Sequence, residues 1–164
     1  MSYILTLNGA LAGISGTLLM DIASVLGGKL GVVVKPSTRF IGRWIAYFFF
    51  GKFKHNDIRR SEAKPYECQL GVITHYLIGV ALGVIFITLI PLDPFSTKNL
   101  AVGLIYGLLT CVLAWFLMMP SFGFGWFGLK GPKEAKIMRT SIYNHLFFGL
   151  GIAVWFNILA FIRL

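Results

Sequence analysis

Four side chains in this 164-residue sequence could take part in chemistry that needs a proton or a ligand. Asp21, His75 and His145 each stand inside a long apolar run, and His55 lies in the basic segment that separates the first two runs. An ionisable group in such a run is costly to insert into a membrane, so it marks a function by default. Three imidazoles and one carboxylate could bind Zn²⁺ or another divalent ion. Without a metal, the same groups could form a proton relay or bind a small polar solute.

The apolar runs that hold these residues are long enough to cross a lipid bilayer. Hydrophobic residues make up 57% of the chain and charged residues 13%, whereas roughly 25% of the residues in soluble domains are charged. A helix needs about 20 mostly apolar residues to span the hydrocarbon core. Four stretches meet this length: residues 3–26, 70–90, 100–119 and 142–162. The sequence therefore predicts an all-α integral membrane protein whose four transmembrane helices form a bundle.

A fifth apolar stretch, residues 38–50, is too short to span and has the pattern of an interfacial amphipathic helix. Large apolar side chains share one helical face: Phe40, Ile41, Trp44, Ile45 and Phe48. Arg39 and Arg43 share another face. Such a helix lies in the plane of the interface, so we expect its aromatic residues in the acyl region and its arginines among the headgroups.

The distribution of basic residues predicts the orientation. Segment 27–69 holds nine Lys and Arg and segment 121–141 holds four, whereas the other side has two. The positive-inside rule places both segments in the cytoplasm and both termini outside it. The net charge of +9 then favours anionic lipid headgroups at the cytoplasmic face as partners. Nucleic acid is not expected, because the charge lies between apolar runs and not on a soluble face.

The three intramembrane residues are expected at one depth. Asp21 lies five residues before the cytoplasmic end of the first span, His75 five residues into the second, and His145 three residues into the fourth. Each is therefore roughly 5–8 Å inside the boundary. Small residues repeat at four-residue spacing on every span: Gly9, Gly13 and Thr17 before Asp21, Gly79 and Gly83 after His75, Gly103 and Gly107 on the third span, and Gly149 and Ala153 after His145. Small ridges let membrane helices approach closely, so the three ionisable residues should face the bundle interior.

Other polar residues could complete or explain this site. Asn144 is close enough in sequence to contribute, and His55 could close over the site from the basic segment. The plainer alternative for Asp21 is a salt bridge to that segment, for which Arg43 is the candidate. No His-x-x-x-His or Cys-x-x-Cys spacing makes a metal site specific.

Several short motifs resemble a known family. They are Gly-Thr-Leu-Leu-Met-Asp ending at Asp21, Gly-Arg-Trp ending at Trp44, the region of His55, His-Tyr-Leu-Ile-Gly beginning at His75, Met119-Pro120, and His-Leu-Phe-Phe-Gly-Leu-Gly beginning at His145. With these the sequence resembles the small bacterial inner-membrane proteins known as domain of unknown function 2938. The resemblance covers nearly the whole chain. It implies a polytopic bacterial membrane protein and supplies no activity.

Three functional hypotheses follow from these residues. The first is a transporter-like or binding protein with an Asp/His polar pocket near the cytoplasmic leaflet, for a small solute, a proton or a lipid headgroup. The second is a metal-dependent membrane enzyme acting on a lipid-borne substrate. The third is a structural or accessory subunit whose polar residues only fix helix packing. Since a four-helix bundle of this size encloses little volume, a wide pore would need a homo-oligomer.

Overall fold

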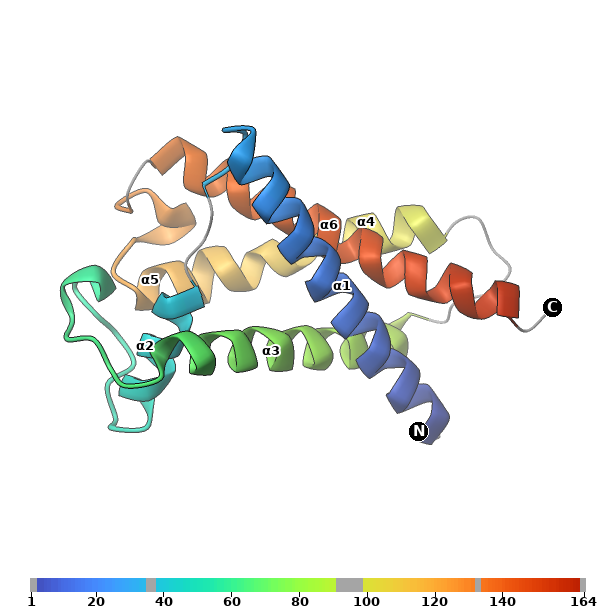
Figure 1. Cartoon of the computed structure of the whole chain (residues 1–164), viewed down its shortest axis with the longest axis horizontal. Helices are drawn as coiled ribbons and strands as arrows, with labels where there is room; N and C mark the ends of the chain where they lie inside the picture. The colour runs from blue at the N-terminus through green and yellow to red at the C-terminus, as the bar shows by residue number, and fades with distance from the viewer. Residues whose placement is uncertain (1–2, 35–37, 91–98, 132–133, 163–164) are drawn as a thin grey trace.

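The computed structural model describes residues 3–34, 38–90, 99–131 and 134–162, and the regular structure of these residues is helical. Its longer helices are α1 (Tyr3–Lys29), α2 (Thr38–Phe48), α3 (Glu67–Leu89), α4 (Asn99–Leu113) and α6 (Glu134–Ile162), as shown in Figure 1. A π-helical turn, Ala114–Met118, carries α4 into the short helix α5, Met119–Ser121. The described loops contain the 3₁₀ turns η1 (Ile58–Arg60) and η3 (Trp126–Gly128).

Among the described residues, four stretches of helix are long and apolar enough to cross a membrane: Tyr3–Lys29, Glu67–Leu89, Leu100–Ser121 and Lys136–Leu159. Large apolar side chains such as Leu18, Leu77 and Leu109 are exposed on their outer faces. The four predicted spans are therefore confirmed as helices, and the chain is an all-α multi-pass membrane protein. The last helix begins eight residues before the predicted residue 142, because a helix end tolerates exposed basic side chains such as Arg139.

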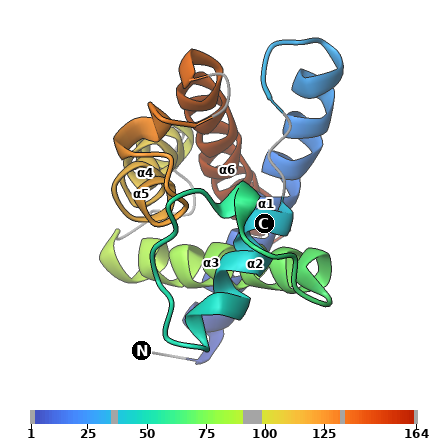
Figure 2. The same ribbon diagram turned by 90° about the vertical axis from the view of Figure 1, so that its left-hand side faces the viewer.

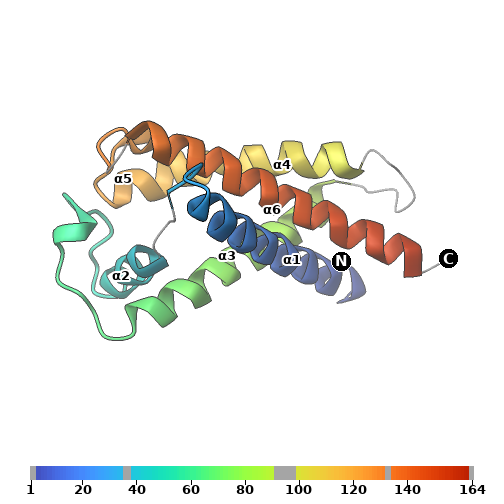
Figure 3. The ribbon, with the colours of Figure 1, turned by 45° about the horizontal axis from the view of Figure 1, so that its top comes forward.

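The bundle has a polar end and an apolar end. α3, α4 and α6 run roughly along the long axis, and α1 crosses them obliquely (Figure 1). α2, η1, α5 and η3 gather at one end, onto which Figure 2 looks, and the chain termini lie toward the other. Figure 3 shows α1 between α3 and α6, with α4 on the far side of α6, in agreement with the extensive packing of α1 on α3 and α6 and of α4 on α6. Both basic loops therefore lie at one end of the bundle.

The spans touch through their glycine ridges. A Cβ atom on Gly13 of α1 would overlap the backbone of Gly79 in α3, and one on Gly107 of α4 would lie 2.9 Å from the Cα atom of Gly149 in α6. Between α1 and α6, a Cβ atom on Gly16 would lie 2.7 Å from the carbonyl oxygen of Phe148. The predicted small-residue ridges are therefore the surfaces along which α1 meets α3 and α4 meets α6. The contact between α1 and α6 runs instead through Gly16 and Gly151, which the predicted ridges did not include.

Aromatic side chains fill the apolar half of the bundle. The ring centroid of Phe86 in α3 lies 4.8 Å from that of Tyr106 in α4 and 5.9 Å from that of Phe156 in α6. The Tyr106 hydroxyl donates a hydrogen bond to the carbonyl of Leu82 at 2.7 Å. This packing lies on the side of the termini, so an apolar core separates the polar residues near α2 from that end of the bundle.

The short helix α2 is present as predicted, but one of its arginines does not lie where we expected. α2 packs on α3 where Gly42 meets the backbone of Glu67 and Gly71. Trp44 is buried against Phe53 and Phe122. The Arg39 side chain is 56% exposed, whereas that of Arg43 is only 7% exposed. Placing Arg43 among the headgroups was therefore wrong, because α2 binds α3 along the very face that carries this side chain.

Candidate functional site

The structure brings Asp21 of α1 and His75 of α3 into contact. The His75 Nε2 atom lies 3.3 Å from the Asp21 Oδ1 atom. One turn away, Gly79 packs on Thr17, whose hydroxyl donates to the carbonyl of Gly13 at 2.9 Å, so the glycine ridge brings the two helices close enough for the pair. The Asp21 side chain is 42% exposed and that of His75 21%. The pair is therefore half-buried and can be reached from the surface of the protein.

His145 belongs to a separate hydrogen-bond chain on α4 and α6. Its Nδ1 atom lies 2.7 Å from the hydroxyl oxygen of Thr110, and that hydroxyl lies 2.6 Å from the carbonyl oxygen of Gly107. The single hydroxyl proton is donated to the carbonyl, so the Nδ1–H of His145 is the donor to the Thr110 oxygen. This tautomer leaves the Nε2 atom of His145 as a hydrogen-bond acceptor.

The helix register places His145 opposite Asp21. In the antiparallel pair of α1 and α6, the Ser15 hydroxyl donates to the carbonyl of Gly151 and the Tyr143 hydroxyl donates to the carbonyl of Ala23. Asp21 lies two residues before Ala23, and His145 lies two residues after Tyr143. These two residues are therefore at the same level of the bundle. The imidazoles of His75 and His145 are also near enough to interact electrostatically. The three intramembrane residues thus share one level, and of the three it is Asp21 and His75 whose side chains are in contact.

Further polar side chains lie at this level. We define the polar layer by its residues: Asp21, Ser24, His75, Thr110, Ser141, Asn144 and His145. The Ser24 Oγ, Ser141 Oγ and Asn144 Oδ1 atoms are buried and have no hydrogen-bond partner within the part of the chain that the structure describes. Buried polar atoms are nearly always paired with protein, water or a ligand. The polar layer therefore has unused capacity for hydrogen bonding.

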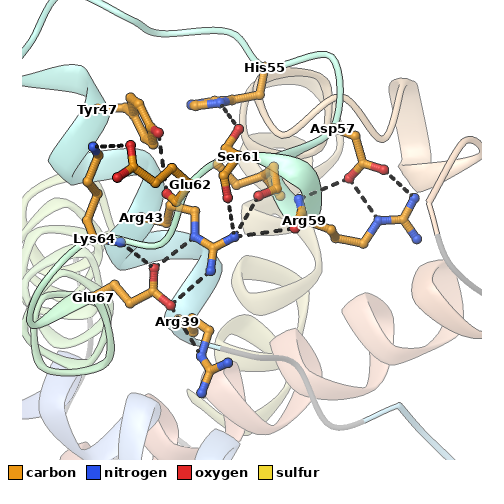
Figure 4. A network of polar contacts seen from close by, with 11 residues as sticks. Arg39, Arg43, Tyr47, His55, Asp57, Arg59, Ser61, Glu62, Lys64 and Glu67 are labelled. Carbon is orange, nitrogen blue, oxygen red and sulfur yellow. Dashed lines mark hydrogen bonds and ion pairs between the residues drawn. The ribbon is translucent and has the colours of Figure 1, made fainter.

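Arg43 does not pair with Asp21, which corrects the plainer alternative for that residue. Its guanidinium binds the carboxylate of Glu67, with Nε to Oε2 at 2.8 Å and Nη2 to Oε1 at 2.9 Å (Figure 4). It also donates to the carbonyl oxygens of Ile58 and Ser61 at 3.0 and 2.9 Å. Hydrogen bonding to Glu67 raises the pKa of Arg43 above its ordinary value. Arg43 therefore acts as the centre of a buried network that holds the loop after α2 onto α3.

His55 belongs to this network and its described contacts do not include the polar layer. Its Nδ1 atom lies 2.8 Å from the Ser61 hydroxyl, and its ring packs edge-on against Tyr47 at 5.0 Å (Figure 4). Its backbone N–H donates to the carbonyl of Ser121, which ties the segment to the turn after α5. The His55 ring is buried, and its Nε2 atom has no partner. Burial lowers the pKa of His55 most, and the positive charges of Lys52 and Arg43 lower it further.

Replacing His55 with Asn should flatten the pH dependence of stability in mildly acidic solution. The unfolded chain binds a proton near the ordinary pKa of 6.5, where the folded protein with its lowered pKa does not. The free energy of unfolding of the wild type should therefore fall as the pH drops through 6.5, by at most about 1.4 kcal/mol per pH unit for one proton. Unfolding in detergent followed at several pH values measures the slope. An identical slope in the Asn variant would show that His55 can be protonated without opening the loop.

The described residues do not form a recognisable metal centre. Within residues 3–34, 38–90, 99–131 and 134–162, no three His, Cys, Asp or Glu side chains lie close enough to hold one ion. The predicted set of Asp21, His55, His75 and His145 provides one pair in contact, and His55 is held by the Arg43 network. A zinc site takes three or four protein ligands. This part of the chain therefore gives the metal hypothesis no structural support.

Sequence reasoning missed several residues around these sites. Ser24 and Thr110 each follow a recognised ridge residue, Asp21 and Gly107, by three positions, so helical spacing could have placed them in the polar layer. Ser61 lies in an irregular loop and carries no comparable signal. Glu67, the first residue of α3, also carries no comparable signal. Its role as the partner of Arg43 depends on how α2 folds back onto α3, which no local pattern encodes.

Comparisons with known proteins place the chain by family alone. Searches of curated proteins and of solved structures gave no significant match. The model of one family covers residues 10–158, a range that includes most of all four spans, the polar layer and the Arg43 network. The chain therefore belongs to the family described as protein of unknown function DUF2938.

Proposed function

We propose that this multi-pass membrane protein is transporter-like and binds a proton and a small polar solute in its polar layer. The observation that carries the proposal is the contact between Asp21 and His75 at 3.3 Å inside two membrane-spanning helices. Histidine is the side chain whose ordinary protonation range lies between about pH 5 and 8, and a carboxylate partner stabilises its charged form. A histidine and a carboxylate in contact between two spans therefore form the site that we propose for one exchangeable proton.

The position of the pair supports access from the cytoplasm. The polar layer lies toward the end that carries both basic loops, and the aromatic core around Phe86 lies on its other side. Basic loops face the cytoplasm in inner-membrane proteins. We therefore place the protein in the bacterial inner membrane, with both termini outside the cytoplasm and the polar layer near the cytoplasmic leaflet.

A proton-uptake titration of the purified protein in detergent tests this proposal. The wild type should take up protons between about pH 8 and pH 5, and the His75→Gln variant should take up fewer because the imidazole is gone. The Asp21→Asn variant should also take up fewer in this range, because the imidazolium loses its carboxylate partner. In liposomes with a trapped pH indicator, the same two variants should slow proton movement driven by a membrane potential.

Asp57→Asn is the matched control for Asp21→Asn. Asp57 is a carboxylate outside the spans, and its hydrogen bond from the Arg59 side chain lowers its pKa. It should therefore stay ionised throughout the titration, and its removal should leave the uptake curve unchanged. Identical curves for the wild type, His75→Gln and Asp21→Asn would refute a proton site. They would favour the structural hypothesis, in which the pair only holds α1 against α3.

A further inference from the structure

The spans contain a single fixed charge. Asp21 is the only Asp, Glu, Lys or Arg in residues 3–26, 70–90, 100–119 and 142–162. When His75 and His145 are neutral, the polar layer therefore carries one negative charge. Phosphate and carboxylate ligands are bound in proteins by Arg, Lys or helix N-termini. A layer with one carboxylate and no basic fixed charge disfavours anions and favours a cation.

Three buried oxygen atoms of the polar layer have no hydrogen-bond partner among the described residues. They belong to Ser24, Ser141 and Asn144, which are 5%, 7% and 6% exposed. Ser24 follows Asp21 by one helical turn, and Asn144 adjoins His145, the residue level with Asp21. An amide oxygen only accepts hydrogen bonds, and a hydroxyl oxygen can accept them. The layer therefore offers acceptors and calls for a ligand with several donors.

We propose that the polar layer binds a primary ammonium ion in exchange for a proton. The three N–H groups of the ammonium would donate to the Asp21 carboxylate and to acceptors such as the Asn144 Oδ1 and Ser24 Oγ atoms. The proton shared by Asp21 and His75 leaves to water, so one positive charge replaces another and the layer stays neutral. This proposal rests on the proposed function and adds to it the chemical class of the solute.

Two observations make the exchange physically reasonable. The Asp21 side chain is 42% exposed, so its carboxylate can be reached without opening the aromatic core. Tyr76 follows His75 on α3 and lies within interaction range of the same carboxylate. An aromatic ring beside a carboxylate is a favourable setting for an organic cation. The alkyl tail of an amine can remain in the lipid or among the exposed apolar side chains around Asp21.

Proton release from the purified protein in detergent tests the proposal. The probes are the chloride salts of ethylammonium, tetramethylammonium and sodium, each added to weakly buffered protein at one pH. Ethylammonium should release about one proton for each protein, as required by a one-for-one exchange. Tetramethylammonium has the same charge but no N–H donor, and it should release none. Equal release by tetramethylammonium or by sodium would overturn the assignment of an ammonium site.

Substitutions distinguish ammonium binding at the polar layer from nonspecific effects on the protein. Asp21→Asn should abolish the release, and Asn144→Ala should raise the ethylammonium concentration for half-maximal release roughly tenfold, the effect of losing one charge-assisted hydrogen bond. Ser24→Ala is a smaller change that tests the same site if Asn144→Ala misfolds. Asn157→Ala is the matched control, because Asn157 is near the other end of α6 and bonds its own helix at Ala153. An unchanged half-maximal concentration in both Asn144→Ala and Ser24→Ala would overturn the proposal.

The two proposals can fail separately. If the wild type takes up protons through His75 but ethylammonium releases none, the proton site stands and the ammonium assignment is wrong. If His75→Gln and Asp21→Asn leave proton uptake unchanged, the proposed proton site is wrong, and the proposed exchange is then wrong as well.

Discussion

Replacing Arg43 with Met should destabilise the folded protein by about 3–5 kcal/mol, the usual cost of removing one partner from a buried ion pair. The Glu67 carboxylate would stay buried after losing both bidentate hydrogen bonds from the guanidinium, retaining the exposed Arg39 at 3.4 Å and the backbone N–H of Lys64 at 3.1 Å. The carbonyls of Ile58 and Ser61 would lose a donor as well. Equilibrium unfolding by a denaturing detergent measures the change in the free energy of unfolding.

Two further variants show whether the pair itself is responsible. Arg60→Met is the matched control, because the Arg60 side chain is 89% exposed and lies 3.8 Å from Asp57. It should change stability by less than about 1 kcal/mol. The double variant Arg43→Met with Glu67→Met should recover part of the loss, since no buried charge is then left alone. A single Arg43→Met variant as stable as the wild type would mean that the loop after α2 opens readily to water.

Replacing Gly13 with Val should both destabilise the bundle and reduce the proton uptake attributed to His75. A Cβ atom at this position would overlap the backbone of Gly79 and lie 2.9 Å from the Cα atom of Val80. Overpacking a tight contact costs about 1–3 kcal/mol, and here both sides of the contact are backbone that cannot rotate away. α1 and α3 must therefore move apart, which lengthens the distance from Asp21 to His75.

Ile14→Val is the matched control for this substitution. Ile14 is the next residue of α1 and is 40% exposed. Removal of one methylene there should change neither stability nor proton uptake by a measurable amount. If Gly13→Val retained normal proton uptake while losing stability, the close approach of α1 and α3 would not be what makes the pair protonatable.

The parts of the fold that depend on local pattern could be predicted from the sequence. The length of the apolar stretches alone predicts the four spans. The four-residue spacing of small residues predicts the helix faces that meet. The same two patterns place Asp21 and His75 at one depth on facing ridges. The prediction failed for Arg43, because the helical face that carries it was considered against lipid only. Its burial depends on Glu67, 24 residues later, and on a loop that folds back between them.

The polar layer shows a similar limit. Ser24, Thr110 and Asn144 are ordinary polar residues, and their types alone do not show whether a neighbouring helix covers them. Their burial follows from the packing of α1 on α6 and of α4 on α6, which run length and spacing do not specify. A sequence therefore indicates which ionisable residues meet, but not which neutral oxygens surround them.

α3 gives the Arg43 network a mechanical connection to the intramembrane pair. Glu67 is the first residue of this helix, and His75 follows eight residues later on the same uninterrupted rod, a distance of about 12 Å along the axis. A helix transmits rotation and translation over two turns with little loss. The residue that anchors α2 and the residue that contacts Asp21 therefore belong to one continuous helix, two turns apart.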